Sequence, residues 1–279
     1  MKDNKTKPFS PKQFNWVRFS CVAILLFFIL IIVVLLGADM LYLATHGVTW
    51  SDFSELLRDK EVISAIKLSV GTSLITLVLV ILVAVPSGYA LSRCRFPIPA
   101  FFNTLVDIPL ILPPVVLGLS LLAIFGTPAG MWIRRTLQSY DIELVSAVGI
   151  VMCQFLVSVS YCIRAAKASF DEVDSRLEDV SLTLGCTPFQ CFRRVTLPLA
   201  RNGLIAGCVM AWARAIGVFG PLMVFVGTSA RVQVMPTAMW LELSIGNIEK
   251  AFVIALIMVA IAGSALILVH WLVPGRKWS

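Results

Sequence analysis

SRLEDVSLTLGCTPFQCFRRVTLP, residues 175–198, is the one long polar interval between strongly apolar segments of the chain. Its local signals predict two short helices joined at Gly185. Ser175 and Glu178 have the spacing of a capping box, in which the two side chains bind backbone N–H groups at the start of a helix. Gly185 follows where this helix can end, because glycine adopts the left-handed backbone conformation without strain.

A second helix start follows this glycine. Thr187 offers a hydroxyl cap, Pro188 suits the first helical position and Gln190 closes another capping box. Apolar residues recur at helical spacing in both helices. They are Leu177, Val180 and Leu184 in the first helix and Phe189, Phe192 and Val195 in the second. A solvated connector needs neither caps nor an apolar stripe, so docking onto another protein is one interpretation. Packing of the pair against its own membrane domain is the alternative.

The composition is that of a membrane protein. The 279 residues are 58% hydrophobic and 14% charged, and the mean hydropathy of +0.90 lies outside the range of soluble globular proteins. A helix needs about 20 apolar residues to cross the hydrocarbon layer. The expected fold is therefore an all-α polytopic membrane protein with six transmembrane helices. The six segments are approximately 17–43, 62–91, 99–125, 142–165, 199–226 and 250–273.

Positive charge sets the expected orientation. The cations before the first segment are Lys2, Lys5, Lys7, Lys12 and Arg18. By the positive-inside rule they place the N-terminal tail, 1–16, in the cytoplasm. Six crossings then make the region 171–198 and the C-terminal tail, 274–279, cytoplasmic too. Arg134 and Arg135 are the main exception, because they fall on the outer side.

The first segment is too long and uninterrupted for a signal peptide, so we expect it to remain as a helix.

The net charge of +7 is mostly this orientation signal. The cations are spread over short loops rather than gathered on a domain, so a nucleic-acid surface is not expected. The seven cysteines lie in helices or face a reducing cytoplasm, so no disulfide framework is expected. Two isolated histidines do not make a metal site, and the phosphate-loop and hydrolase motifs are absent from the sequence. We expect no catalysis, bound cofactor or metal from this chain alone.

Segment 99–125 carries prolines at positions 109, 113 and 114 inside an apolar run. Each proline removes a helical hydrogen bond, so a kinked or broken helix is expected. Irregular backbone is tolerated at membrane depth where it lines a wet cavity, so Pro113 and Pro114 are pathway candidates, and a purely structural kink is the alternative. Asp107 is another candidate, because a carboxylate in a spanning segment is costly. Its alternative is a shallow position that reaches the cytoplasmic interface.

Segment 199–226 contains small residues at every fourth position. They are Gly203, Gly207, Ala211 and Ala215. They form one smooth face on which another helix can approach closely, and such a face is also compatible with a dimer.

The same segment contains WARAIGVFGP, which combines a cation with residues that loosen a helix. Arg214, Gly217 and Gly220 are therefore pathway candidates. An arginine at that depth needs a partner, a wet cavity or an anion, and a pathway for a negatively charged solute supplies the last two. A structural pair with Asp107 or with backbone carbonyls is the alternative.

The interval 175–198 resembles the EAA loop of ATP-binding-cassette (ABC) importer permeases, in which an acidic-Ala-Ala triplet precedes a glycine and a later Leu-Pro pair. Asp179-Val180-Ser181 stands at the triplet, Gly185 at the glycine and Leu197-Pro198 at the closing pair. The departures are aspartate for glutamate and Val-Ser for Ala-Ala. The resemblance implies that this loop is a cytoplasmic coupling helix pair. The residues it implies for ATPase coupling are Glu178, Asp179, Val180, Ser181, Gly185, Thr187, Pro188, Leu197 and Pro198.

Two further stretches are similar to the third and fifth helices of the molybdate, tungstate and sulfate permeases. They are DIPLILPPVVLGLSLLAIFGTPAG and ARAIGVFGPLMVFVG. In that subgroup the second stretch usually reads A-R-x-L-G-E-F-G, and Val218 stands here in place of the glutamate. The likeness covers about residues 92–260. It implies a type I ABC importer permease fold and an oxyanion such as molybdate, tungstate or sulfate as the solute.

The resemblance also implies the partners and the location. A second permease copy would complete a homodimer in the lipid bilayer of the bacterial inner membrane. Two cytosolic ABC ATPase subunits would hydrolyse ATP with Mg, and an extracytoplasmic solute-binding protein would deliver the solute. Other interpretations stay open: a permease for iron, phosphate or an organic solute, an ion-gradient secondary transporter, and a membrane-embedded enzyme. A secondary transporter usually shows inverted repeats and ionisable residues at the midplane, whereas this sequence has no evident internal repeat and only Asp107 and Arg214 as strong ionisable candidates.

Overall fold

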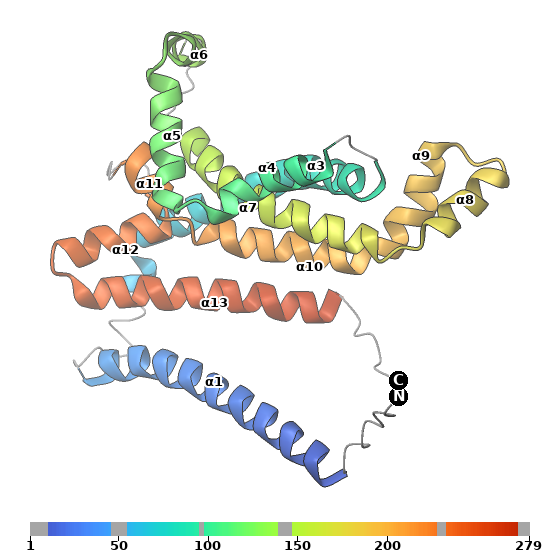
Figure 1. The fold of residues 1–279 in the computed structure, drawn as a ribbon. Coiled ribbons are helices and arrows are strands. Elements are labelled where there is room, and N and C mark those ends of the chain that lie inside the picture. The colour runs from blue at the N-terminus through green and yellow to red at the C-terminus, as the bar shows by residue number, and fades with distance from the viewer. Residues whose placement is uncertain (1–10, 46–54, 95–97, 139–146, 228–232, 273–279) are drawn as a thin grey trace, which may run out of the picture. The chain divides into compact units, whose positions relative to one another are not determined.

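The computed structural model describes residues 11–45, 55–94, 98–138, 147–227 and 233–272, and in these ranges it contains helices and no strands. The expected all-α fold is thus confirmed (Figure 1). The chain divides into two units, 1–54 and 55–279. Most of the expected N-terminal tail, the whole C-terminal tail and the start of the expected segment 142–165 lie outside the described ranges.

The first unit contains α1 (Pro11–Thr45), a continuous helix of 35 residues. Its apolar residues occupy all sides of the helix rather than one stripe, which is typical of a helix surrounded by lipid. The large apolar side chains from Phe19 to Leu41 are exposed. The stretch Phe19–Tyr42 is long and apolar enough to cross a membrane, and the expected segment 17–43 lies within α1.

Four long helices build the second unit. They are α3 (Lys60–Arg93), α7 (Ala147–Asp171), α10 (Leu197–Ile216) and α13 (Ile248–Leu272). Each contains, or lies within, a stretch that is long and apolar enough to cross a membrane. α7 packs against both α3 and α10, and α10 also packs against α13 (Figure 1).

Small residues bring α10 and α7 close together. A Cβ atom added to Gly207 would lie 2.4 Å from the Cβ of Ala165, and one added to Gly203 would lie 2.3 Å from the Oγ of Ser169. Ala211 on the same face is also buried. Close backbone approach of this kind lets helices gain van der Waals contact inside a membrane. The expected smooth face is confirmed, but its partner is α7 of the same chain rather than a second copy.

Segment 99–125 is broken as expected. It forms α4 (Pro99–Ile111) and α5 (Pro114–Gly126), whose axes are bent by 103°. Leu112 and Pro113 between them are extended, with ψ angles of 135° and 132°. Each of these two residues precedes a proline, which disfavours the helical conformation. The two halves together are long and apolar enough to cross a membrane, so the described residues contain five of the expected spans, or six when this bent pair is counted as one. A short helix, α6 (Pro128–Gln138), follows α5.

The second broken segment lies beside the first. α10 ends at Ile216, Gly217 follows as its cap, and the chain resumes as α11 (Gly220–Phe225). α5 packs on α11, and the apolar cluster that joins them includes Leu117, Ile150, Val218 and Leu222. The two helix breaks are therefore held together by a buried apolar core.

An ion-pair cluster links the start of α3 to α12 (Met235–Ser244) and α13. The Nζ of Lys250 lies 2.8 Å from Asp59 Oδ2, 2.8 Å from Glu242 Oε1 and 2.9 Å from Glu61 Oε2. Lys250 and Glu242 are buried, and a buried ammonium group is tolerated because carboxylates satisfy its donors. The cluster fixes the α12–α13 turn to the beginning of α3.

Candidate functional site

The helix pair predicted in the polar interval is present at one end of the second unit (Figure 1). It consists of α8 (Ser175–Thr183) and α9 (Pro188–Cys191), and η1 (Phe192–Thr196), a π-helical turn, leads on into α10. The predicted Ser175 capping box is wrong. Asp174 caps α8 instead, and its Oδ1 accepts a 3.0 Å hydrogen bond from the N–H of Arg176. An aspartate is as good a cap as a serine, and it stands one residue earlier.

The turn between the helices is built around Gly185, as expected. Gly185 has a φ of +89°, in the left-handed region. The N–H of Cys186 donates to the carbonyl of Ser181 at 3.1 Å, and the N–H of Gly185 donates to that of Leu182 at 3.0 Å. This pattern is a Schellman motif, which satisfies the last carbonyls of α8.

The second capping box is confirmed at the start of α9. The backbone N–H of Thr187 donates to Oε1 of Gln190 at 3.0 Å. The backbone N–H of Gln190 donates in return to Oγ1 of Thr187 at 3.3 Å. Both ends of the turn are therefore fixed by local hydrogen bonds.

Glu178 is turned inward, away from the cap for which it was predicted. Its carboxylate accepts hydrogen bonds from Arg93 Nε at 2.9 Å, from Thr196 Oγ1 at 2.9 Å and from Tyr89 Oη at 3.4 Å. Arg93 also donates from Nη2 to the carbonyl of Val173 at 2.7 Å. Glu178 is buried, so this paired carboxylate joins α8 to the end of α3 and to η1.

Aromatic rings support the same junction. The ring of Tyr89 lies 5.5 Å from that of Phe170 and 4.8 Å from that of Phe192, both in edge-on geometry. Phe170 is fully buried in a cluster with Val173. One side of the helix pair therefore packs on its own membrane domain, as the alternative interpretation expected.

The other side of the pair is uncovered in the described chain. Leu184 is 80% exposed and Phe189 is 71% exposed, and Leu177 and Val180 are exposed as well. A soluble surface rarely presents several large apolar side chains side by side on a rigid support. We call these four residues the apolar tip. The docking interpretation is thus compatible with one face of the pair and the packing interpretation with the other.

The residues predicted for coupling divide between the two faces. Glu178 and Ser181 are buried and Leu197 is partly buried. The exposed ones are Asp179, Val180, Gly185, Thr187, Pro188 and Pro198.

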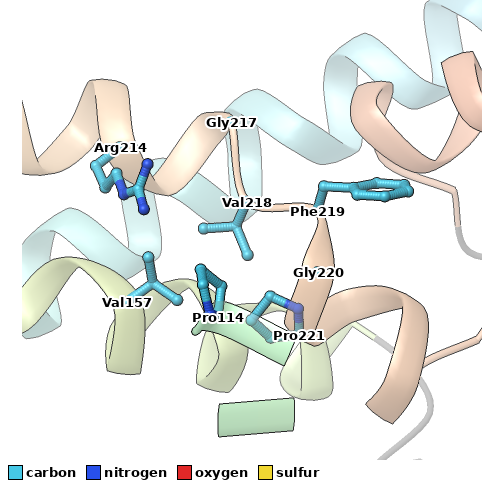
Figure 2. Close-up of a pocket in the computed structure, with 8 residues that line it drawn as sticks. All are labelled: Pro114, Val157, Arg214, Gly217, Val218, Phe219, Gly220 and Pro221. Atoms are coloured by element: carbon cyan, nitrogen blue, oxygen red, sulfur yellow. The ribbon is translucent and has the colours of Figure 1, made fainter. Parts of the chain in front are cut away.

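A second site lies where the two helix breaks meet. A Cβ atom added to Gly118 in α5 would lie 2.8 Å from the Cα of Pro221 in α11, and one added to Gly220 would lie 3.1 Å from Cγ2 of Val115. Beside this close contact is a cavity of about 180 Å³ (Figure 2). Its lining residues are Pro114, Val157, Arg214, Gly217, Val218, Phe219, Gly220 and Pro221.

Four of the six predicted pathway residues line this cavity: Pro114, Arg214, Gly217 and Gly220. Pro113 is adjacent, as the residue that caps α5. Asp107 is not part of the cavity lining, because it lies in α4 and pairs with Arg164 of α7 through both carboxylate oxygens. The suggested structural pair between Asp107 and Arg214 is therefore wrong.

Arg214 instead lies over an aromatic ring. Its guanidinium carbon is 5.5 Å from the centre of the Tyr161 ring in α7, within the range of a cation–π interaction. Figure 2 shows the Arg214 side chain beside Val157 and Val218 at the cavity. The arginine is thus positioned by contact with α7, and no residue in the described ranges accepts a hydrogen bond from its N–H donors.

Sequence reasoning missed the partners of the predicted residues. Arg93, Tyr89 and Thr196 hold Glu178, and Tyr161 supports Arg214. One signal was available for the contact between Arg93 and Glu178. These two residues carry opposite charges and belong to segments expected on the same side of the membrane.

Known sequences similar to this chain are transport proteins. Residues 84–278 match the family described as binding-protein-dependent transport system inner membrane component. A probable molybdenum ABC transporter permease protein of Haloferax volcanii is 36% identical over 210 residues, 75% of each chain. The molybdate/tungstate transport system permease protein WtpB of Thermococcus kodakarensis is 33% identical over 221 residues, 79% of this chain and 82% of WtpB. The sulfate transport system permease protein CysW of Synechocystis is 30% identical over 261 residues, 92% of this chain and 93% of CysW.

Solved structures share the fold at low sequence identity. A chain of a bacterial alginate ABC transporter, in complex with an alginate-pentasaccharide-bound periplasmic protein, matches with a TM-score of 0.72 at 14% identity, over 92% of this chain and 94% of that one. A chain of the inward-facing MetNI methionine ABC transporter gives a TM-score of 0.60 at 15% identity, over 76% and 94%.

Proposed function

Because the chain belongs to the family of binding-protein-dependent transport system inner membrane components, we propose that it is the permease subunit of an ABC importer for an oxyanion such as molybdate, tungstate or sulfate. It forms the translocation pathway and hydrolyses no ATP itself. Support for the solute class comes from relatives at 30–36% identity, whose names specify molybdenum, molybdate/tungstate and sulfate transport.

The importer contains other subunits. In this proposal two copies of the chain pair as a homodimer, two cytosolic ABC ATPase subunits bind and hydrolyse ATP with Mg, and an external binding protein delivers the oxyanion. This chain binds no cofactor. The end of the bundle that carries α8 and α9 faces the cytoplasm, as do both termini.

The observation that carries the coupling role is the apolar tip on its rigid support. Leu177 and Val180 on α8, Leu184 at the cap that ends α8, and Phe189 on α9 are all exposed. The opposite side of the pair is fixed to α3 through Glu178 and Arg93. An apolar helix face of this kind fits a groove on a partner. When the ATPase subunits close on ATP, the tip moves with them and pulls on α3 through this ion pair.

The pathway in this proposal runs past the two helix breaks. Both breaks place irregular backbone at membrane depth, which is tolerated where it lines a wet cavity. Pro113, Pro114, Gly217 and Gly220 give the backbone its shape there. Asp107 has a positioning role, because Arg164 satisfies its carboxylate.

The test is reconstitution of the chain in liposomes with a cognate ABC ATPase and solute-binding protein. We expect ATP-dependent accumulation of radiolabelled molybdate, tungstate or sulfate that requires all three components. Uphill transport by the purified chain alone on an ion gradient would identify a secondary transporter. ATP-driven uptake of iron, phosphate or an organic solute, with none of the three oxyanions transported, would contradict the proposed solute class.

A further inference from the structure

Arg214 lies near the end of a stretch, Pro188–Ile216, that is long and apolar enough to cross a membrane. It is in the last turn of α10, about 26 Å along the helix axis from Leu197 at 1.5 Å per residue. The hydrocarbon layer is about 30 Å thick. Arg214 is nevertheless exposed in the described chain. A guanidinium group within a membrane span requires water or a counter-ion, and the cavity that Arg214 lines has room for either.

Two carboxylates of the second unit, on α4 and α12, are already paired with other cations. Asp107 binds Arg164, and Glu242 binds Lys250. In the described ranges the Arg214 guanidinium lies over the ring of Tyr161, which orients it without using its N–H donors. Within the described residues the guanidinium is therefore a positioned cation whose donors can bind a ligand.

The cavity beside Arg214 suits a small anion. None of its eight lining residues is acidic, so nothing in the lining repels negative charge. A volume of about 180 Å³ has room for several water-sized groups, and a tetrahedral oxyanion consists of four oxygens around one centre. Val157 and Val218 make part of the wall apolar, which strengthens the attraction between arginine and anion by lowering the local dielectric.

We propose that Arg214, held by Tyr161, is a transient binding site for the tetrahedral oxyanion during its passage. The planar guanidinium can donate two parallel N–H bonds to two oxygens of one anion. A single charged contact attracts the anion yet lets it leave, as conduction requires. This inference deepens the proposed function and rests on it.

The test measures oxyanion uptake by the complete importer in liposomes. We expect Arg214→Gln to lower the initial rate of uptake about tenfold or more, because hydrogen bonds to a charged group contribute on that scale. Arg214→Lys should recover only part of the rate, since an ammonium group lacks the planar fork. Tyr161→Leu should lower the rate about threefold, and Tyr161→Phe, which keeps the ring, should leave it unchanged.

Arg201 supplies the matched control. It is an exposed arginine on the same helix, close to the helix pair, and Arg201→Gln should transport as the unmodified protein does. Stimulation of ATP hydrolysis by the loaded binding protein should persist in Arg214→Gln, which separates a lost binding site from failed assembly. If Arg214→Gln does not assemble, uptake by assembled Arg214→Lys and Tyr161→Leu decides the question.

Unchanged uptake in Arg214→Gln, or in both Arg214→Lys and Tyr161→Leu, would overturn the assignment. This failure is distinct from failure of the proposed function. If the unmodified importer transports none of the three oxyanions, the proposed function is wrong. If it transports them and the Arg214 variants do so equally well, only the binding site is wrong.

Discussion

Arg93, the last residue of α3, donates a 2.9 Å hydrogen bond from its Nε to Oε1 of Glu178 in the middle of α8. The pair is mostly buried, with side-chain exposures of 17% and 11%. It connects a membrane-spanning helix to the helix pair that bears the apolar tip. Through this connection, a movement of the apolar tip would be transmitted directly to α3.

The first prediction concerns this pair. Glu178→Ala should reduce oxyanion transported per ATP hydrolysed, because it leaves Arg93 without its partner and releases α8 from α3. Removing one member of a buried pair costs about 3 kcal/mol or more. The measurement is the ratio of uptake to ATP hydrolysis in liposomes. Glu172→Gln, at an exposed glutamate just before α8, is the control and should keep the normal ratio. An unchanged ratio in assembled Glu178→Ala would show that the pair plays no part in coupling.

Local signals in the sequence were sufficient for the helix ends and the breaks. Gly185, the Thr187 capping box and the prolines around 113 act on backbone atoms a few residues away, so they can be predicted without tertiary structure. The choice between Asp174 and Ser175 as cap could not be made in this way. Both residues can cap a helix, and the preference depends on whether Glu178 is free to close a box.

Tertiary partners could not be predicted from the same signals. Arg93 and Glu178 are 85 positions apart, and Tyr161 and Arg214 belong to helices separated by the polar interval. Periodicity showed that α10 has a smooth face, but not that α7 covers it. Such pairings depend on how the helices are arranged in the bundle, which no local pattern specifies.

The second prediction tests the turn. Gly185→Val should impair coupling, because a β-branched residue at a φ of +89° is strained by about 1–2 kcal/mol. No atom lies within 4 Å of a Cβ at this position, so the effect would come from the backbone and not from a clash. Gly185→Asn is the matched variant, since asparagine tolerates this conformation. Membrane insertion should be normal in both. Equal transport by the valine and asparagine variants would argue against a need for the left-handed turn.

The third prediction separates the two possible caps of α8. Asp174→Ala should destabilise the helix by about 1 kcal/mol, because it leaves the N–H of Arg176 without its acceptor. Ser175→Ala should have almost no effect, since Ser175 is already inside the helix. Hydrogen exchange of the α8 amides measures the difference. Faster exchange in Ser175→Ala than in Asp174→Ala would contradict this prediction and would support the Ser175 capping box predicted from the sequence.

The fourth prediction concerns pH. The hydrogen bond from Lys250 lowers the pKa of Asp59 below its usual value, and the bond from the N–H of Glu61 acts in the same direction. A carboxylate with a depressed pKa in the folded state contributes stability above its unfolded pKa of about 4 and loses it as the pH falls through the folded value. Asp59→Asn should therefore flatten the loss of thermal stability below about pH 4. The measurement is the unfolding temperature in detergent between pH 3 and 7. The same dependence on pH in Asp59→Asn and in the unmodified protein would contradict the prediction.

The last prediction concerns the close packing of α10 on α7. Gly207→Ala should destabilise the fold by about 1–3 kcal/mol, because its Cβ would lie only 2.4 Å from the Cβ of Ala165 and the two helices would have to separate. Gly263→Ala in α13 is the matched control, since no atom lies within 4 Å of a Cβ there. Alanine in an open helical position is expected to stabilise by about 0.5–1 kcal/mol. Thermal unfolding in detergent should thus shift in opposite directions for the two variants. A shift to higher temperature in Gly207→Ala would mean that α7 and α10 are less closely packed in the membrane than the structure shows.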